Sequence, residues 1–160
     1  QPTTTVGVAR NADVLTYPYT GNVLTTVGSC YAELFTEANV GAIVAVAVGV
    51  SGRPLYLQGS QALTFTEVFD STATVSKSGL TSLGTAVRKR ASTWDSASSL
   101  MTVTGDGATP ASGAFDGIMG STANLSIGHD NSIINWYGTI RNLRIYSTAL
   151  SSAQLTAMTS

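Results

Sequence analysis

Side chains able to do covalent chemistry are sparse in this sequence. Its glutamates are Glu33, Glu37 and Glu67. Glycoside hydrolysis needs two carboxyl groups at a set separation, but no E-x-D-x-x-E run places such a pair on one strand. Glu33 and Glu37 fall on the same face of an expected strand with Phe35 between them, and we expect that face to be solvated.

Histidine and cysteine each occur once, as His129 and Cys30. A serine triad would have to use His129, and no G-x-S-x-G elbow accompanies it. One His and one Cys far apart do not make a zinc site, and a lone Cys in a strand is usually a small buried apolar residue. Calcium needs several oxygens at one point, whereas the aspartates considered for it are scattered singly: Asp95, Asp106, Asp116 and Asp130. We therefore expect no catalysis, no metal and no cofactor.

Sugar binding is the chemistry that the remaining candidates support. Sugars stack on exposed Trp and Tyr rings, which combine a flat apolar face with a polar edge. Two stretches place such a ring near hydrogen-bonding side chains. The resulting candidates for carbohydrate binding are Trp94, Asp95, His129, Asp130, Asn131 and Trp136. The alternatives are that the tryptophans pack in the core and that the His-Asp-Asn run only forms a turn through side-chain-to-backbone bonds.

The elements that would position these residues read mostly as strands. A strand that carries Leu125 and Ile127 on one face is expected before the turn Gly128-His129-Asp130-Asn131, because apolar side chains recur there with period two. Residues 136–146, rich in aromatic and β-branched side chains, are expected to resume as a strand after it. Leu143 and Ile145 share one face and Arg144 the other. Ile140 is out of phase with Leu143, which indicates either a β-bulge near Asn142 or a real break with Ile140 facing outward.

The end of the chain has the signals of a short helix. Ser151 and Gln154 have the spacing of a capping box, and Leu150 and Leu155 that of a hydrophobic staple. Leu155 and Met158 then lie on one helix face. We expect a helix over residues 151–158 that closes the core.

The rest of the chain reads as short strands separated by turns. Residues 29–37 alternate cleanly, and the apolar run 41–50 favours either a central strand buried on both faces or one whose alanine face, Ala45 and Ala47, lines an interface between protomers. Residues 51–54 and 105–107 are expected turns, residues 109–115 a loop, and Trp94-Asp95 part of a loop. About ten to thirteen strands at short spacing argue for a sandwich or barrel.

Composition limits the partners. The chain has 160 residues, of which 43% are hydrophobic and 11% charged, with a net charge of −1. This net charge is unlike that of nucleic-acid-binding domains, which are strongly basic. No apolar run is long enough for a membrane span. We expect Arg88-Lys89-Arg90 to form a solvated strand face. Residues 1–9 are expected to be a leader or linker before one domain over 10–160, and Gln1 in place of Met suggests a piece of a longer chain.

The two ends of the chain carry motifs in common with a known family. Near the start stands the run Arg10-Asn11-Ala12-Asp13-Val14-Leu15-Thr16. Near the end stand Ile127-Gly128, then Gly138, Ile140 and Leu143-Arg144-Ile145-Tyr146, then Leu150-Ser151 and Ala153-Gln154-Leu155. In this order and at this separation they resemble laminin-G-like, concanavalin A-like jelly-roll modules of tailed-phage virion proteins, such as tail fibres and head decorations. The resemblance spans nearly the whole chain.

The resemblance implies an all-β fold: an antiparallel β-sandwich of the concanavalin A-like jelly-roll type with one short C-terminal α-helix. It also implies a structural role on the surface of a phage particle, with other virion proteins and further copies of the chain as partners. Two roles stay open. The module either binds host-surface carbohydrate, or it is an architectural decoration protein that stabilises the capsid or fibre and binds no glycan.

Overall fold

The computed structural model describes residues 15–18, 20–36, 43–48, 52–57, 65–70, 73–84, 86–117, 119, 124–130, 134–135 and 138–160. The leader expected over residues 1–9, and the boundary at residue 10, lie outside these ranges.

The described residues form strands joined by short turns, and one helix. The strands are β1 (Leu15–Pro18), β2 (Val27–Thr36), β3 (Ile43–Val48), β4 (Gly52–Leu57), β5 (Thr66–Phe69), β6 (Thr74–Lys77), β7 (Arg88–Asp95), β8 (Leu100–Gly105), β9 (Ala111–Ala114), β10 (Asn124–Ile127), β11 (His129–Asp130), β12 (Ile134–Asn135) and β13 (Gly138–Tyr146), and the helix is α1 (Ser152–Thr159). Their pairings are antiparallel. The expected antiparallel sandwich with one short C-terminal helix is confirmed.

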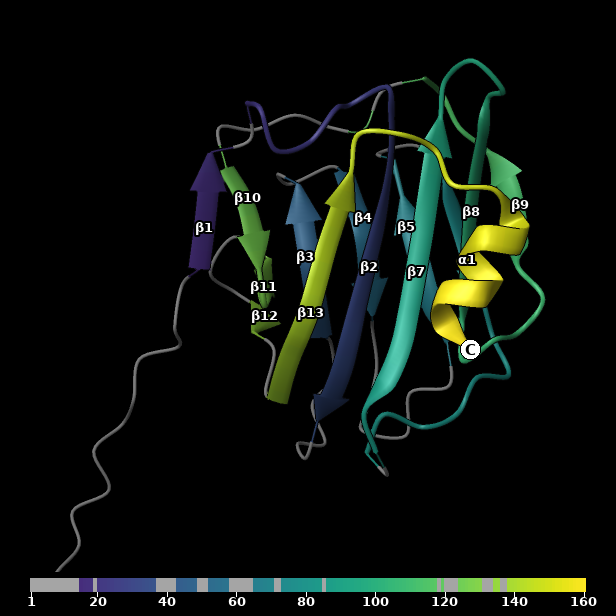
Figure 1. Ribbon diagram of the computed structural model, residues 1–160. Coiled ribbons are helices and arrows are strands. Elements are labelled where there is room, and N and C mark those ends of the chain that lie inside the picture. Colours follow the sequence, from purple (N-terminus) through teal and green to yellow (C-terminus); the bar gives the residue numbers. More distant parts are fainter. Residues whose placement is uncertain are drawn as a thin grey trace, which may run out of the picture.

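Two sheets form the layers of the molecule. One has the strand order β1-β10-β3-β4-β5-β6, the other the order β13-β2-β7-β8-β9, and β11 and β12 form a separate small pair. Figure 1 shows the two large sheets stacked face to face, with α1 on the outer surface of the sheet that contains β7 and β8. Strand β3 is an interior strand, flanked by β10 and β4.

The main core lies between the two sheets. Strand β2 sends Cys30, Ala32 and Leu34 into it, each at most 1% exposed. Tyr31 points the other way, into a second cluster beneath the helix. This alternation is the period-two pattern of the sequence, because successive side chains of a strand point to opposite faces.

The helix covers that second cluster. Leu155 is fully buried against Tyr31 and Ala91, with Leu150 packed beside it. At the helix start the backbone N–H of Gln154 donates to the Ser151 hydroxyl at 3.3 Å, and the Ser151 N–H donates to the Gln154 side chain at 2.8 Å. The predicted capping box is therefore confirmed.

Several expected boundaries were wrong. β4 begins at Gly52, so residues 52–54 of the expected turn over 51–54 are strand, and Pro54 lies where the register shifts against both β3 and β5. Proline lacks the N–H that a regular ladder requires, so such irregular points tolerate it. β9 likewise occupies part of the expected loop over residues 109–115.

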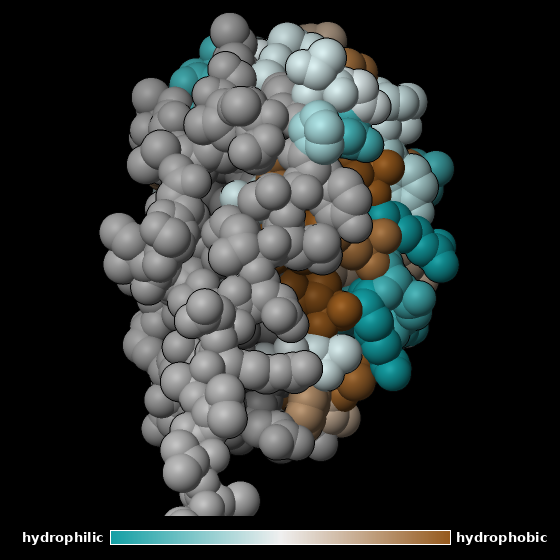
Figure 2. Space-filling model, turned by 90° about the vertical axis from the view of Figure 1, so that its left-hand side faces the viewer, coloured by the Kyte–Doolittle hydropathy of each residue, from teal (hydrophilic) through white to brown (hydrophobic). Residues whose placement is uncertain are grey.

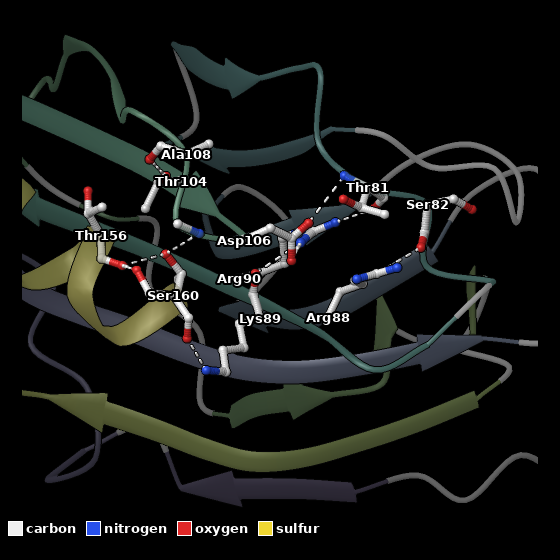
Figure 3. A network of polar contacts seen from close by, with 12 residues as sticks. Thr81, Ser82, Arg88, Lys89, Arg90, Thr104, Asp106, Ala108, Thr156 and Ser160 are labelled. Atoms are coloured by element: carbon white, nitrogen blue, oxygen red, sulfur yellow. Dashed lines mark hydrogen bonds and ion pairs between the residues drawn. The ribbon is translucent and has the colours of Figure 1, made fainter.

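The solvated face expected over Arg88-Lys89-Arg90 was also wrong. Arg90 is fully buried, and its Nη1 forms an ion pair with Asp106 Oδ1 at 2.7 Å while Nη2 donates to the Thr81 carbonyl at 2.8 Å (Figure 3). Period two explains the burial, because Arg90 lies on the same face of β7 as Trp94, and that face points between the sheets. Burial lowers the pKa of Arg90, and the nearby Asp106 opposes this effect.

Lys89 lies on the opposite face of β7, where its ammonium donates to the carbonyl of Ser160 after the helix (Figure 3). Arg88 donates through Nε to the Ser82 carbonyl at 3.3 Å (Figure 3). The three adjacent basic residues therefore have different contacts, which a description as one solvated run misses.

Candidate functional site

A β-bulge on β13 shapes the side of the molecule where the two sheets diverge. The register of β13 against β2 shifts between Arg141 and Arg144, and Asn142 has a φ of 49°. Asn adopts this left-handed conformation more readily than most residues. The bulge returns Leu143 to the inner face, so that Ile140 and Leu143 both pack against the main core. Of the two interpretations of Ile140, the bulge is confirmed.

A cleft of about 480 Å³ lies beside this bulge. Its apolar wall comes from the facing sides of β10 and β13, and its polar margin from the bulge and from the turn after β1. The lining residues are Asn22, Leu125, Ile127, Ile140, Arg141, Asn142, Leu143 and Ile145. We call this the edge cleft. Figure 2 looks at this side of the molecule, where hydrophobic surface lies beside a strongly hydrophilic margin.

Glu33 on β2 anchors the polar margin of the edge cleft. Arg141 donates through Nε to Glu33 Oε2 at 2.8 Å, and the Tyr31 hydroxyl donates to Oε1 at 3.1 Å. A hydrogen bond from the Asn142 side chain is the largest cause that lowers the pKa of Glu33, and the bonds from Arg141 and Tyr31 add to it against the opposing effect of burial. Glu33 is therefore held as an anion that orients Arg141 and Asn142.

Tyr31 belongs to the same cluster of polar contacts as Glu33 and Arg141. Burial raises the pKa of Tyr31 to about 12, and its hydrogen bond to Glu33 contributes in the same direction. The guanidinium carbon of Arg144 lies 5.8 Å from the centre of the Tyr31 ring, a distance at which a cation and an aromatic face attract each other.

A second depression, of about 330 Å³, lies on the outer face of the β7–β8 pair beside the start of α1. Its walls are rich in hydroxyl groups, and Leu100, 46% exposed, is its apolar patch. We call it the helix groove; its lining residues are Thr93, Asp95, Ser98, Leu100, Thr102, Ala149, Leu150, Ser151, Ser152 and Gln154.

Several polar atoms of the helix groove already have structural partners. Asp95 accepts from the Ala97 N–H at 3.0 Å and from the Ser98 hydroxyl at 2.8 Å, which holds the turn between β7 and β8. Ser151 and Gln154 cap the helix, as described above. A ligand in the helix groove would compete with these bonds, whereas Arg141 at the edge cleft bonds the described residues through Nε alone, to Glu33.

Trp94 was wrongly placed as a candidate in a loop. It lies within β7, is fully buried in the main core, and donates through Nε1 to the Leu24 carbonyl at 3.0 Å. A Cβ added at Gly28 would approach the ring to 2.4 Å, so this glycine gives the ring its space. A ring without exposed surface offers no face for a sugar to stack on. The packing alternative holds for Trp94.

The other predicted candidates are only partly covered by the described residues. His129 and Asp130 form β11, whose partners in β12 are Asn135 and Ile134, so the expected turn contains a short strand pair. Asn131 and Trp136 lie outside the described residues, as do the side chains of His129 and Asp130. The same holds for the side chains of Ala45 and Ala47.

Sequence reasoning missed the edge cleft as a site. Neither Arg141 nor Asn22 was a candidate, and Asn142 entered only as the position of a possible β-bulge. The signal that pointed there was the phase break between Ile140 and Leu143, because a bulge both re-aims neighbouring side chains and interrupts pairing.

The described carboxylates of β2 and β5 have structural partners. Glu33 is bound as above, and Glu67 accepts from the Ser76 hydroxyl at 2.6 Å. Glu37 lies outside the described residues. Within the described part of the chain, no group of three or more His, Cys, Asp or Glu residues is arranged to hold a metal ion, and no helix is long and apolar enough to cross a membrane.

Comparison with known proteins relates the chain to others through its fold. No family model matches it, and no curated protein sequence does. Among solved structures, the carbohydrate-binding module CBM40 of the Ruminococcus gnavus IT-sialidase, bound to α2,3 sialyllactose, is similar over 94% of this chain and 95% of its own, with a TM-score of 0.68 and 14% identity.

Two further solved structures have the same fold. Domain 4 of AbnA, an extracellular arabinanase from Geobacillus stearothermophilus in complex with arabinotriose, matches 85% of this chain and 68% of its own at a TM-score of 0.62 and 20% identity. A leech intramolecular trans-sialidase matches 92% of this chain at a TM-score of 0.68 and 18% identity, but only 26% of its own length is involved. These similarities place the chain among β-sandwiches that include carbohydrate-binding modules.

Proposed function

We propose that this chain is a non-catalytic carbohydrate-binding module on the surface of a tailed-phage particle, where it binds host-surface glycans. The observation that carries the carbohydrate part is the edge cleft. Its apolar wall suits the C–H face of a sugar ring, and its Asn and Arg margin supplies hydrogen-bond donors for hydroxyl groups. Support comes from the solved structures of similar fold, among them modules in complex with sialyllactose and arabinotriose.

The phage setting rests on the sequence motifs at the two ends of the chain. On this proposal the partners are other virion proteins and further copies of the same chain, and the location is the outside of the particle. Nucleic acid and the membrane interior are not partners. Antibody labelling of purified particles tests the setting: label on the particle surface supports it, and label confined to the host cell contradicts it.

A second role, architectural decoration without glycan binding, is favoured by one observation, the charged fraction of only 11%. Surfaces that pack against other subunits are depleted in charge. The position on the particle separates the two roles. A place in the capsid lattice favours stabilisation, whereas a fibre tip favours host recognition.

Binding is tested by an array of host-surface glycans, followed by titration of ¹⁵N-labelled protein monitored by NMR. We expect binding at millimolar glycan or better, with chemical shifts that change over residues 138–145 of β13. Shifts confined to residues 93–102 and 149–154 would move the site to the helix groove. Shifts around His129, with loss of binding in Trp136→Ala, would move it to the β11–β12 end. A protein that binds nothing at millimolar glycan is architectural.

Absence of catalysis and of a metal requirement is tested with the same glycans. Mass spectrometry after prolonged incubation should return each oligosaccharide intact, because the described carboxylates Glu33 and Glu67 serve hydrogen-bond and ion-pair roles. Turnover that Glu33→Gln abolishes would contradict this assignment. Addition of EDTA should leave the affinity unchanged, and a loss that calcium restores would reveal a metal.

A further inference from the structure

The bulge on β13 places a cation and an amide next to each other at the margin of the edge cleft. Arg141 and Asn142 both line the cleft, and Asn22 contributes a second amide from the turn after β1. The other described residues of the lining are aliphatic. A charged group at the margin of an otherwise apolar cleft is the kind of placed polar group that determines which ligand a pocket prefers.

Arg141 has donors beyond the one that Glu33 uses. A guanidinium carries five N–H groups in a planar fork, and the bond to Glu33 at 2.8 Å is made by Nε. The Arg141 side chain is 56% exposed, against 15% for Glu33, so the cation is the partner that solvent or a ligand can reach. The fixed Nε bond orients the plane of the guanidinium and leaves its Nη1–Nη2 edge as a bidentate donor pair.

Glu33 does not cancel the attraction of Arg141 for a ligand anion. Its carboxylate accepts hydrogen bonds from Tyr31 and Arg141, and the Asn142 side chain is the largest cause that lowers its pKa. It therefore acts as an anchor whose acceptor capacity is largely used inside the protein. A ligand carboxylate at the Nη edge would complete the arrangement, with one anion on each side of the guanidinium.

We infer that the edge cleft takes a saccharide that bears a carboxylate, with the carboxylate bound to the Nη edge of Arg141 and the sugar ring against the apolar wall of β10 and β13. The inference rests on the proposed carbohydrate-binding function and names the class of ligand for that site. Asn22 uses one amide N–H on the Pro18 carbonyl at 2.7 Å, and Asn142 bonds Glu33. An amide NH₂ carries two N–H donors, so each keeps one for a sugar hydroxyl beside the carboxylate.

The test compares acidic saccharides with neutral partners of the same shape or core. The probes are 3′-sialyllactose against lactose, and trigalacturonate against its methyl ester, each titrated into ¹⁵N-labelled protein. We expect the acidic member of at least one pair to bind about tenfold more tightly, as a charge-assisted hydrogen-bond pair gives. Added salt should reduce this ratio, because the attraction between exposed charges is screened.

Two variants test whether Arg141 causes the preference for acidic saccharides. Arg141→Gln should lower the affinity for the acidic saccharide about tenfold and leave the neutral partner unchanged. The matched control is Arg144→Gln, which removes a cation from the same strand at a residue that does not line the cleft, and it should change neither affinity by more than about twofold. Circular dichroism and thermal unfolding of each variant establish that it is folded.

The outcomes separate this inference from the function on which it rests. Binding of neutral and acidic saccharides with equal affinity overturns the inference and leaves the carbohydrate-binding function standing. An acidic preference that survives in Arg141→Gln, or that is lost in Arg144→Gln, also overturns it. If none of the four saccharides and no glycan of the array binds at millimolar concentration, both fail.

Discussion

The ion pairs Arg90–Asp106 and Arg141–Glu33 use the same chemistry in different surroundings. The side chains of the first pair are 0% and 18% exposed, whereas Arg141 of the second is 56% exposed. A buried charge depends on its partner because no water replaces it, while an exposed charge is hydrated without one. We therefore assign the Arg90 pair to stability and reserve the exposed Arg141 for the proposed ligand site.

Asp106→Asn tests the first assignment. Asn keeps the shape of Asp and tolerates the φ of 51° at this turn, so the change mainly removes the charge opposite Arg90. We expect a loss of about 3 kcal/mol in the free energy of unfolding, measured with urea, because Arg90 is left as an unpaired buried cation. The matched control Arg141→Gln should cost less than about 1 kcal/mol. Equal losses in the two variants would contradict the assignment.

The lowered pKa of Glu33 predicts how the stability of the protein depends on pH. The pKa of Glu33 is lowered from the usual value of 4.5 in the folded protein, so the folded state binds fewer protons than the unfolded state below pH 4.5. The stabilisation from Glu33 is then fully present above the unfolded-state pKa and is lost as the pH falls through the folded-state pKa. Urea unfolding should show a larger difference between wild type and Glu33→Gln at pH 7 than at pH 3. A difference independent of pH would refute this role.

At the scale of elements, helix α1 combines local and long-range stabilisation. The capping box of Ser151 and Gln154 needs only residues three apart in the sequence, whereas Leu155 is buried against β2 and β7. This division explains why the helix was predicted correctly from the sequence although it is only eight residues long.

Ser151→Ala tests the cap. It removes the acceptor of the Gln154 N–H and should lower the free energy of unfolding by about 1 kcal/mol. Ser152→Ala, one residue further on an exposed position, is the matched control and should have almost no effect. If thermal unfolding shifts equally in both variants, the cap contributes nothing specific.

The bulge on β13 is the element that links fold to site. It restores the inward direction of Leu143, and the residue that makes it, Asn142, also lines the edge cleft and bonds Glu33. Edge strands with regular ladders invite pairing with other chains, and a bulge with charged neighbours opposes this. The same irregularity therefore both protects the edge and builds the proposed site.

At the scale of the whole molecule, the proposed location on the surface of a phage particle predicts that the chain associates with further copies of itself. Light scattering at high protein concentration should give a mass that is a multiple of the 16.5 kDa chain. Ala45→Lys and Ala47→Lys place a charge on the strand suggested as an interface and should lower that mass, whereas Ser98→Lys, on an exposed turn, should not. A protein that stays monomeric at every concentration would contradict the oligomeric part of the proposal.

The sequence by itself determined what depends on neighbours within a few residues. Period two located β2 and its two faces, the capping box located α1, and the phase break between Ile140 and Leu143 located the bulge. It misjudged Trp94 because a loop was expected where β7 continues to Asp95. It misjudged Arg90 because period two fixes which residues share a face but not which face of β7 turns inward. That choice follows from the packing of the two sheets against each other.

The candidate site needed the tertiary structure even more. Arg141 and Glu33 are 108 residues apart in the chain, and the two walls of the edge cleft belong to strands of different sheets. Nothing in the local pattern near either residue specifies the other, because the register of β13 on β2 is set by the combined burial of all their inward side chains. Local spacing therefore determined the elements of this protein, and only the long-range pairing of strands brought the residues of the candidate site together.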